Sequence, residues 1–258
     1  MQKQQSVSLK KFSALGIGGA AGIVYFPESA AELAGLLADN PRRPVIGGGT
    51  NIFFGDLPEL ICTRHLNKIT ETAAGVEAEC GALLEKLFDF AAGVPATAGG
   101  GVAMNFGAFG YELKDFLVSA QIWNCGKINI LPLEELRLGY RTSGFSGTVL
   151  RVLFKQKQLA DKAGCLRQRQ EKMPLGKPNI GSIFLNPPGQ SAGALIEKAG
   201  LKGYRLKGLQ VSEKHANVIV NNGTASAVDL RELISFIKKT VWESSGVELS
   251  LEIKYIGH

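Results

Sequence analysis

The stretch that decides the fold reads Gly93-Val94-Pro95-Ala96-Thr97-Ala98-Gly99-Gly100-Gly101-Val102-Ala103-Met104-Asn105-Phe106-Gly107-Ala108-Phe109-Gly110. It is rich in glycine and contains no charged side chain. Because glycine has no Cβ and tolerates positive φ, such a loop brings backbone N–H groups close to a ligand. A second run, Gly47-Gly48-Gly49-Thr50-Asn51, lies upstream between apolar segments. Two amide-rich loops predict a large anionic ligand that is held on both sides of its phosphates.

Composition and charge indicate a globular protein with one large domain or two to three small ones. The chain has 258 residues, of which 45% are hydrophobic and 20% charged, and its net charge is +6. Its lysines and arginines are scattered, which favours a solvated basic surface and small anionic ligands over nucleic acid. The sequence has no long apolar run and no apolar segment after its N-terminus. We therefore expect a cytoplasmic protein without a membrane partner.

The cysteines and histidines do not form a metal-ligand pattern. The four cysteines are far apart, no C-x-x-C pair occurs, and the three histidines have no ligand spacing. We expect reduced, mostly buried thiols and no structural metal. These residues are Cys62, Cys80, Cys125, Cys165, His65, His215 and His258.

Short β patterns and a few helical patterns alternate along the chain, which predicts an α+β fold without internal repeats. Ser29-Ala30-Ala31-Glu32 is a capping box that begins a helix, and Asn124-Cys125-Gly126 is a hairpin signal. Expected strands cover residues 23–26, 44–46, 52–54, 60–62, 118–123, 127–131, 149–154, 218–220 and 247–255. Expected helices cover residues 29–38, 83–92, 159–172, 192–199 and 227–242.

Changes in composition divide the chain into three expected domains. Residues 1–65 form a first α/β unit, residues 66–157 form a second unit around the long glycine stretch, and residues 158–258 form a C-terminal α+β domain. Val247 to Tyr255 alternates apolar and polar residues, which predicts a continuous last strand with Glu252 and Lys254 on one face.

A match to the dinucleotide-binding fingerprint lies in the wrong context. Gly16-Ile17-Gly18-Gly19-Ala20-Ala21 fits G-x-G-x-x-A, and Asp39 follows at the usual distance. The fingerprint requires a helix after the glycines, whereas residues 23–26 are β-like and end at Pro27. We expect a turn before the first strand.

Three polar positions are candidates for chemistry, each with a structural alternative. Arg141, beside Tyr140, could bind a carboxylate in bidentate fashion or lie on the surface. Ser182 lies in an apolar setting, where its hydroxyl either caps a turn or donates a proton. Glu252 and Lys254 form either an acid/base and cation pair in a cleft or a solvated edge.

Five motifs in a preserved order resemble the UDP-N-acetylenolpyruvoylglucosamine reductase (MurB) family. The resemblance runs from about Phe12 to Gly257. Departures from the family pattern occur at Ala96, Phe106 and Leu185. The motifs are Gly47–Asn51, Gly93–Gly110, Tyr140–Phe145 (Y-R-T-S-G-F), Gly181–Pro187 (G-S-I-F-L-N-P) and the pair Ala199–Gly203 with Val211–Asn217 (V-S-E-K-H-A-N).

The resemblance implies a flavoenzyme of peptidoglycan precursor synthesis, of the shorter family subtype. The implied fold is vanillyl-alcohol-oxidase-like: two FAD-binding subdomains and a C-terminal substrate-binding α+β domain. It implies non-covalent FAD, which NADPH reduces and which then delivers hydride to UDP-N-acetylglucosamine enolpyruvate to give UDP-N-acetylmuramate. We also expect a monomer.

The resemblance also assigns roles to residues. Ser182 would supply a proton, Arg141 would bind the substrate carboxylate, and Glu252 would stabilise the enol form. FAD would be bound by Gly47, Gly48, Gly49, Thr50, Asn51, Thr97, Gly99, Gly100, Met104, Asn105, Gly107 and Ala108. The substrate would be bound by Tyr140, Asn186, Lys214, Lys254 and Lys172.

Three other classes of function remain open from the sequence. The first is another flavin oxidase or dehydrogenase whose substrate lacks UDP. The second is a non-catalytic protein that binds a nucleotide sugar or a flavin. The third, a nucleic-acid-binding module, would need a basic aromatic surface that the sequence does not display.

Overall fold

The computed structural model describes residues 1–257 and divides into two compact units. Unit 1 comprises Met1–Val7, Ala21–Gly48 and Pro58–Leu166, and unit 2 comprises Ser8–Ala20, Gly49–Leu57 and the residues from Arg167 onward. Each unit has its own apolar core. The mixture of helices and sheets confirms the predicted α+β class. The three-domain division at residues 65 and 157 stays a prediction.

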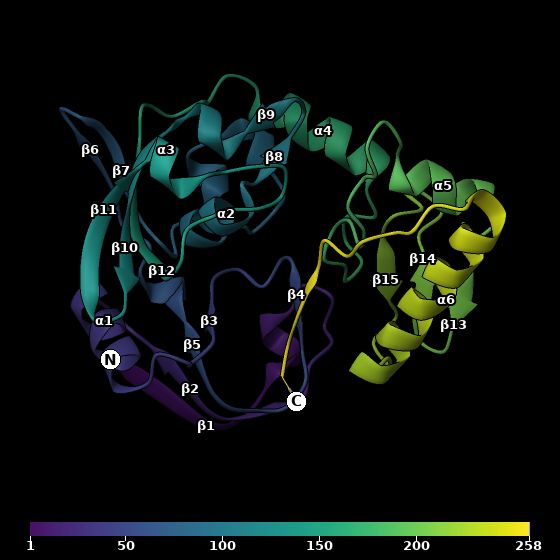
Figure 1. Cartoon of the computed structure of the whole chain (residues 1–258), viewed down its shortest axis with the longest axis horizontal. Coiled ribbons are helices and arrows are strands. Elements are labelled where there is room, and N and C mark those ends of the chain that lie inside the picture. The colour runs from purple at the N-terminus through teal and green to yellow at the C-terminus, as the bar shows by residue number, and fades with distance from the viewer. Residues whose placement is uncertain (258) are drawn as a thin grey trace. The chain divides into compact units, whose positions relative to one another are not determined.

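Unit 1 contains two sheets and a small hairpin (Figure 1). A four-stranded sheet has the order β1-β2-β5-β3, in which β3 runs parallel to β5. An antiparallel five-stranded sheet has the order β11-β10-β12-β7-β6. The strands are β1 (Gln2–Ser8), β2 (Ala20–Phe26), β3 (Val45–Ile46), β5 (Leu57–Cys62), β6 (Ile69–Thr72), β7 (Gly75–Glu79), β8 (Gly107–Ala108), β9 (Tyr111–Glu112), β10 (Leu117–Asn124), β11 (Lys127–Pro132) and β12 (Thr148–Phe154).

The helices of unit 1 are short, and the first confirms its predicted cap. The Ser29 hydroxyl accepts the N–H of Glu32 at 3.1 Å, and the helix buries three leucines. The α-helices are α1 (Ala30–Asp39), α2 (Ala98–Met104) and α3 (Leu133–Leu136), and the 3-10 turns are Thr63–His65, Leu84–Lys86, Asp89–Ala91 and Leu113–Asp115.

The helix predicted over residues 83–92 is wrong, because the segment forms two 3-10 turns instead. Its backbone N–H groups are used outside the segment: Leu84 donates to the Ala96 carbonyl and Asp89 to the Gln158 carbonyl, both at 2.9 Å. Phe88 and Phe90 are both fully buried. The bonds to distant carbonyls and the burial of these phenylalanines are tertiary contacts, and they override the helical pattern of the segment.

The long glycine stretch is not only a loop, as its composition had suggested, because it contains α2. Gly99 and Gly101 serve close packing there. A Cβ at Gly99 would lie 2.9 Å from Cys80 Cβ, and one at Gly101 would lie 2.6 Å from Leu84 Cδ1. Helix α2 can therefore pack against β7 and β12.

Unit 2 is built around a parallel strand pair, β4 (Ile52–Phe54) with β16 (Lys254–Ile256), and a three-stranded antiparallel sheet. Helix α4 (Lys162–Lys172) begins in unit 1 and continues into unit 2. The three-stranded sheet consists of β13 (Arg205–Leu206), β14 (Leu209–Val211) and β15 (Ile219–Asn221), and the remaining helices are α5 (Ala192–Lys198) and α6 (Ala227–Ser245).

The fingerprint-like segment at Gly16 is a turn, as predicted, and the strand β2 follows it. Gly16 has a φ of +69° and donates its N–H to the Ser13 carbonyl at 2.9 Å. A 3-10 turn over Leu9–Phe12 precedes it. The expectation that this turn comes before the first strand is wrong, because β1 lies upstream. The polar sequence of β1, with five exposed residues at its start, gave no β signal.

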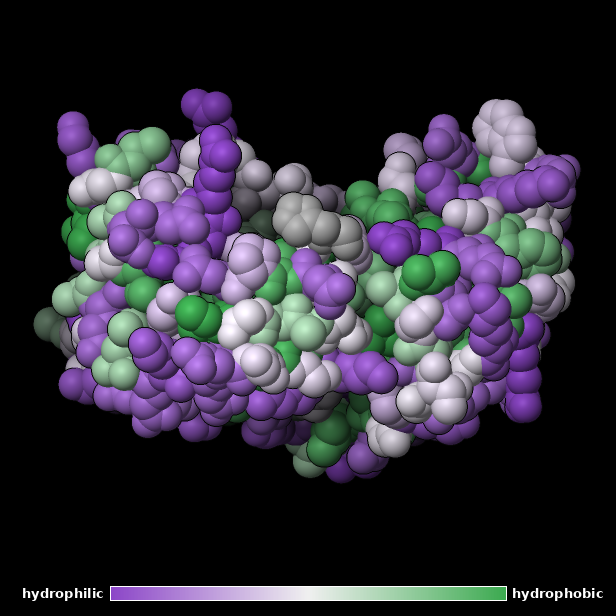
Figure 2. Space-filling view, turned by 90° about the horizontal axis from the view of Figure 1, so that it is seen from below, coloured by the Kyte–Doolittle hydropathy of each residue, from purple (hydrophilic) through white to green (hydrophobic). Residues whose placement is uncertain are grey.

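The surface and the helices bear on the expectation of a protein without a membrane-spanning segment. Hydrophilic residues cover much of the face shown in Figure 2, with hydrophobic residues between them. Of the helices in residues 1–257, none combines the length and the apolar composition needed to cross a bilayer.

The cysteines differ in burial. Cys62 and Cys80 are buried, whereas Cys165 is half-buried and Cys125 is exposed at its hairpin. The thiols are thus less buried than expected. Burial raises the pKa of Cys80 to about 12.

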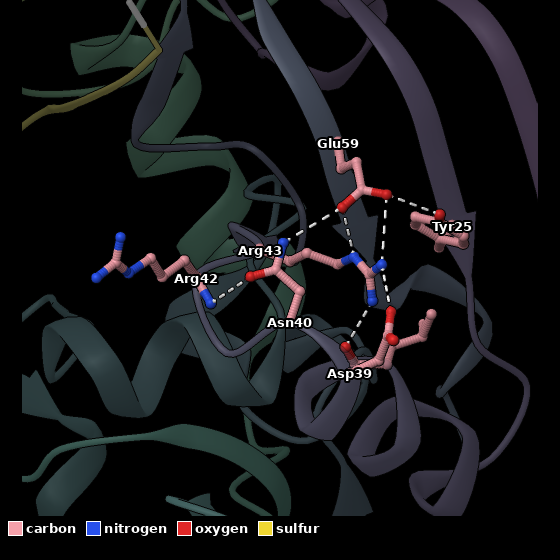
Figure 3. A network of polar contacts seen from close by, with 7 residues as sticks. Tyr25, Asp39, Asn40, Arg42, Arg43 and Glu59 are labelled. Atoms are coloured by element: carbon pink, nitrogen blue, oxygen red, sulfur yellow. Dashed lines mark hydrogen bonds and ion pairs between the residues drawn. The ribbon is translucent and has the colours of Figure 1, made fainter.

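An ion-pair network in unit 1 fixes the approach to the first glycine run (Figure 3). The Arg43 guanidinium donates to Glu59 at 2.6 Å and to Asp39 at 2.6 Å, and Tyr25 donates to Glu59 at 2.9 Å. The hydrogen bonds from Arg43 lower the pKa of Glu59. Because Arg43 directly precedes Pro44 and β3, the network ties α1 and β5 to the strand that leads into Gly47.

We predict that Glu59→Gln lowers the free energy of unfolding by about 1–3 kcal/mol, because the guanidinium of Arg43, only 8% exposed, loses one of its two carboxylate partners and keeps only Asp39. The loss should shrink as the pH falls through the lowered pKa of Glu59, since the wild-type carboxylate is then protonated too. Urea denaturation at neutral and acidic pH measures both effects. The surface pair Lys157–Glu71 is the control, and Glu71→Gln should cost clearly less than Glu59→Gln, because exposed ion pairs contribute little to stability. Equal losses would contradict the prediction.

Candidate active site

The two glycine-rich stretches meet inside unit 1. A Cβ at Gly47 would overlap the Thr97 hydroxyl, and a Cβ at Gly48 would overlap the Pro95 carbonyl. Only glycine fits at these two positions. The loop after β3 therefore lies directly against the start of α2, as a ligand held by both stretches would require.

Several hydrogen-bond donors at this junction have no acceptor within residues 1–257. The Thr97 hydroxyl is buried without a partner. No hydrogen bond inside the described chain uses the backbone N–H groups of Gly47, Gly48 or Gly100. Ala98 and Gly99, by contrast, donate to Ala82 and Cys80 at 2.8 Å. Thr97 is a buried donor, and buried donors are almost always paired, whereas Gly47 and Gly48 are half-buried and Gly100 is exposed. Together these groups can donate to an anionic ligand such as a phosphate.

Asn105 shapes the end of the long glycine stretch. It is fully buried, has a φ of +41° and ends α2. Its side-chain amide donates to the Gly139 carbonyl at 2.9 Å and to Glu112 at 3.2 Å, and it accepts the N–H of Lys114 at 3.1 Å. The amide of Asn105 thus has protein partners at both ends.

Arg141 is oriented by the same stretch. Its guanidinium donates to the Gly107 carbonyl at 2.7 Å and to the Asn105 carbonyl at 3.4 Å, and it stacks over the exposed Tyr140 ring at 5.3 Å. Arg141 itself has a φ of +54°, an uncommon conformation for a residue other than glycine. Arg141 is half-buried, and its two roles considered from the sequence, carboxylate binding and a surface position, stay predictions. Met104 and Ala108, beside these residues, are half-buried.

In unit 2, Ser182 lies on an extended segment held on both sides. Ser182 forms a bridge with Val218, and Ile183 donates to the Asn217 carbonyl at 2.9 Å. On the other side, Leu185 donates to the Ser250 carbonyl at 2.8 Å. The backbone that carries the Ser182 hydroxyl is therefore fixed, and Ser182 is itself only half-buried.

Glu252 sits at a β-bulge opposite this segment. Both Glu252 and Ile253 donate their N–H groups to the Ile183 carbonyl, at 2.9 and 3.5 Å. The continuous strand predicted over residues 247–255 is therefore wrong. Leu251, expected on the buried face, is 43% exposed, and only Lys254–Ile256 is regular strand. Bulges re-aim side chains, so strict alternation does not govern Glu252 and Lys254.

Asn51 joins the end of the first glycine run to this bulge within unit 2. Its side-chain amide donates to the Glu252 carbonyl at 3.0 Å, and its own carbonyl accepts the N–H of Lys254 at 3.0 Å. Gly49 packs so closely on the backbone of Phe12 that a Cβ would overlap the Phe12 carbonyl. Thr50 is half-buried between them.

The remaining predicted substrate residues of unit 2 lie on its surface. The Lys214 ammonium donates to the Gln170 carbonyl on α4 at 2.9 Å, and Lys172 is exposed at the end of the same helix. The Asn186 side-chain oxygen Oδ1 accepts the N–H of Ala192 at the start of α5, at 3.0 Å. Lys254 is exposed on β16.

His215 is a half-buried residue to which sequence reasoning gave no role. Its Nδ1 accepts the N–H of Asn217 at 3.2 Å, so this nitrogen is unprotonated. Burial lowers its pKa, and the charge of Lys202 acts in the same direction. His215 lies in the V-S-E-K-H-A-N motif, which was noted for its resemblance to the family. A single histidine in a sequence does not indicate whether its ring is buried.

We predict that protein stability decreases as the pH falls below about 6.5, the ordinary histidine pKa, because the unfolded chain then binds a proton that folded His215 resists. His215→Asn should flatten this decrease, since asparagine can still accept the Asn217 N–H but does not titrate. Thermal unfolding between about pH 7.5 and pH 5.5 measures it. Parallel curves for wild type and His215→Asn would refute the assignment.

Comparisons with known proteins identify the family of this chain. The model of the UDP-N-acetylenolpyruvoylglucosamine reductase C-terminal domain matches residues 173–256. A reductase of that name from Caldicellulosiruptor bescii is 36% identical over 96% of this chain and 89% of its own length. The Aquifex aeolicus relative is 36% identical over 98% of this chain and 94% of its own length.

A solved structure has the same fold. The crystal structure of UDP-N-acetylenolpyruvylglucosamine reductase (MurB) from Thermus caldophilus aligns with a TM-score of 0.82 and 31% identity, over 99% of both chains. Fold and sequence together define an oxidoreductase of α+β architecture. The chain belongs to the UDP-N-acetylenolpyruvoylglucosamine reductase (MurB) family. The resemblance inferred from five motifs is confirmed.

Proposed function

We propose that this protein reduces UDP-N-acetylglucosamine enolpyruvate to UDP-N-acetylmuramate in peptidoglycan precursor synthesis, with NADPH as reductant and non-covalently bound FAD. Membership in the reductase family supports the reaction. The observation that carries the cofactor assignment is the set of unpaired donors at the junction of the glycine stretches. The monomeric state and the cytoplasmic location stay predictions from the sequence.

The residues of unit 1 fit a dinucleotide cofactor. The buried Thr97 hydroxyl and the N–H groups of Gly47, Gly48 and Gly100 can donate to a pyrophosphate. Asn105 and Gly107 define the far end of the stretch through their contacts with Arg141. Bound FAD would supply hydride chemistry, and the protein supplies the backbone donors that orient it.

We predict that Gly48→Ala loses most of its FAD, because the added Cβ would overlap the Pro95 carbonyl and force the two stretches apart. The measurement is the flavin absorbance of purified protein, together with FAD titration of the stripped protein. Gly35→Ala is the control: it adds the same methyl group in the same unit, and a Cβ at Gly35 meets no atom within 4 Å. Gly35→Ala should keep its FAD. Full FAD retention in Gly48→Ala would contradict the proposed cradle.

Ser182 is the proposed proton donor to the substrate. Reduction of the enolpyruvyl double bond adds hydride to one carbon and requires a proton on the other. The two hydrogen-bonded neighbours of the Ser182 segment fix the backbone from which the hydroxyl projects. Within the described chain, no hydrogen bond occupies the half-buried Ser182 hydroxyl, so it can serve the substrate.

Arg141 and Glu252 are proposed to stabilise charge on the substrate. Negative charge grows on the substrate carboxylate after hydride addition and before the proton arrives. A guanidinium that two carbonyls already orient can stabilise this charge without reorganisation. Glu252 is held at its bulge by Ile183 and Asn51, where it can stabilise the enol form or relay a proton. Tyr140, Asn186, Lys172, Lys214 and Lys254 are proposed to contact the sugar and diphosphate.

We predict that Ser182→Ala keeps its FAD and its reduction by NADPH but loses about 100-fold or more in turnover of the enolpyruvyl substrate, because the proton donor is missing. Stopped-flow measurement of each half-reaction separates the two steps. Ser250→Ala is the control: Ser250 is exposed on the adjacent segment and contributes its backbone carbonyl, which the variant retains. Turnover of Ser182→Ala at the wild-type rate would exclude this role.

A further inference from the structure

We propose that Asn217 is a positioning residue for the proton transfer. Its side-chain amide pairs with the backbone of the Ser182 segment, as a neighbouring β-strand would, and so fixes that segment. This inference rests on the proposed function, because it assumes that Ser182 donates the proton. Asn217 itself is 3% exposed and lies on the chain segment next to Ser182, not at the surface.

The contacts of Asn217 with Phe184 have the pattern of a β-ladder. The Asn217 Oδ1 accepts the Phe184 N–H at 3.0 Å, and the Asn217 Nδ2 donates to the Phe184 carbonyl at 2.8 Å. One side chain thus pairs with both backbone groups of one residue, as an opposing strand residue would. Asparagine has both a donor and an acceptor at this length, whereas aspartate can only accept and alanine can do neither.

The backbone around Asn217 explains why a side chain, and not a neighbouring strand, bonds the Phe184 backbone. The Asn217 carbonyl accepts the Ile183 N–H at 2.9 Å, and Ser182 bridges Val218. Beyond this point the chain turns away, because Val218 donates to the His215 carbonyl and Asn217 donates to the His215 ring. The chain before Asn217 therefore does not continue alongside Phe184, and the amide of Asn217 replaces the missing backbone pair.

The opposite edge of the segment does not bond the backbone groups of Phe184. There Phe184 bridges Leu251, and the bonds of this bridge lie on either side of Phe184, from Glu252 to the Ile183 carbonyl at 2.9 Å and from Leu185 to the Ser250 carbonyl at 2.8 Å. The N–H and carbonyl of Phe184 are therefore bonded by the Asn217 side chain on the other edge. Phe184 is two residues from Ser182, and we infer that these two bonds set the position of the hydroxyl.

The test measures the two half-reactions of FAD-loaded Asn217→Ala and Asn217→Asp. In Asn217→Ala we expect reoxidation by the enolpyruvyl substrate to slow at least tenfold while reduction by NADPH stays within twofold. Asn217→Asp keeps the acceptor for the Phe184 N–H and loses the donor, so it should slow less. Amide hydrogen exchange at Phe184 should become faster in Asn217→Ala, a readout that is independent of activity.

Asn221 provides a matched control in the same unit. It is equally buried, at 3% exposure, and its side chain also bonds backbone groups, of Leu15, Gly223 and Ala225. None of these lies on the Ser182 segment. Asn221→Ala should therefore lower the melting temperature without slowing reoxidation more than twofold. Equal slowing in both alanine variants would overturn the proposal, because it would reduce the role of Asn217 to general stability.

A double variant separates this inference from the proposed function. If Asn217 acts through Ser182, then Asn217→Ala should slow the reaction little further in a Ser182→Ala background. A full additional tenfold loss in that background would overturn the positioning role. Full turnover in Ser182→Ala alone would instead refute the proposed function. If Asn217→Ala does not fold, Asn217→Asp and the double variant Ser182→Ala/Asn217→Asp carry the same comparison.

Discussion

The close approach of Gly47 and Gly48 to the start of α2 is the constraint on which the rest of unit 1 depends. No side chain larger than hydrogen fits between these glycines and the Thr97 hydroxyl or the Pro95 carbonyl. The Arg43–Glu59 ion pair fixes the strand that delivers the glycines, and Gly99 and Gly101 allow α2 to pack against β7 and β12. Glycine therefore serves here mainly to let backbone segments touch, and less to permit unusual φ angles.

The proposed chemistry of unit 2 rests on a different kind of restraint, namely hydrogen bonds from both sides of one extended segment. As a proton donor, Ser182 needs a fixed backbone and a hydroxyl that is not hydrogen-bonded to another group of the protein. Asn217 supplies the fixation on one side and the chain from Ser250 to Ile253 supplies it on the other. Polar side chains buried in such a place are costly unless every group is paired, and both ends of the Asn217 amide are.

Sequence reasoning identified the glycine runs, the capping of α1 and the hairpin at Cys125, because each depends on local chemistry. It failed where distant contacts decide. Phe88 and Phe90 are buried on all sides, so the predicted helix around them does not form. Leu251 fits an alternating pattern, but the bulge places it at the surface. The ladder formed by Asn217 joins residues 33 positions apart, which no local pattern could reveal.

The order in which unit 2 assembles follows from the long sequence separation of its contacts. Strand β4, about one fifth of the way along the chain, pairs with β16, and the Asn51 side-chain amide bonds a carbonyl 201 residues downstream. Asn221 closes onto Leu15 across 206 residues. During synthesis on the ribosome, the early segments of unit 2 must wait for nearly the whole chain to emerge. Contacts of such long sequence separation slow folding, and the apolar segments Leu15–Ile17 and Ile52–Phe54 stay without their native partners during that interval, when exposed apolar surface favours aggregation.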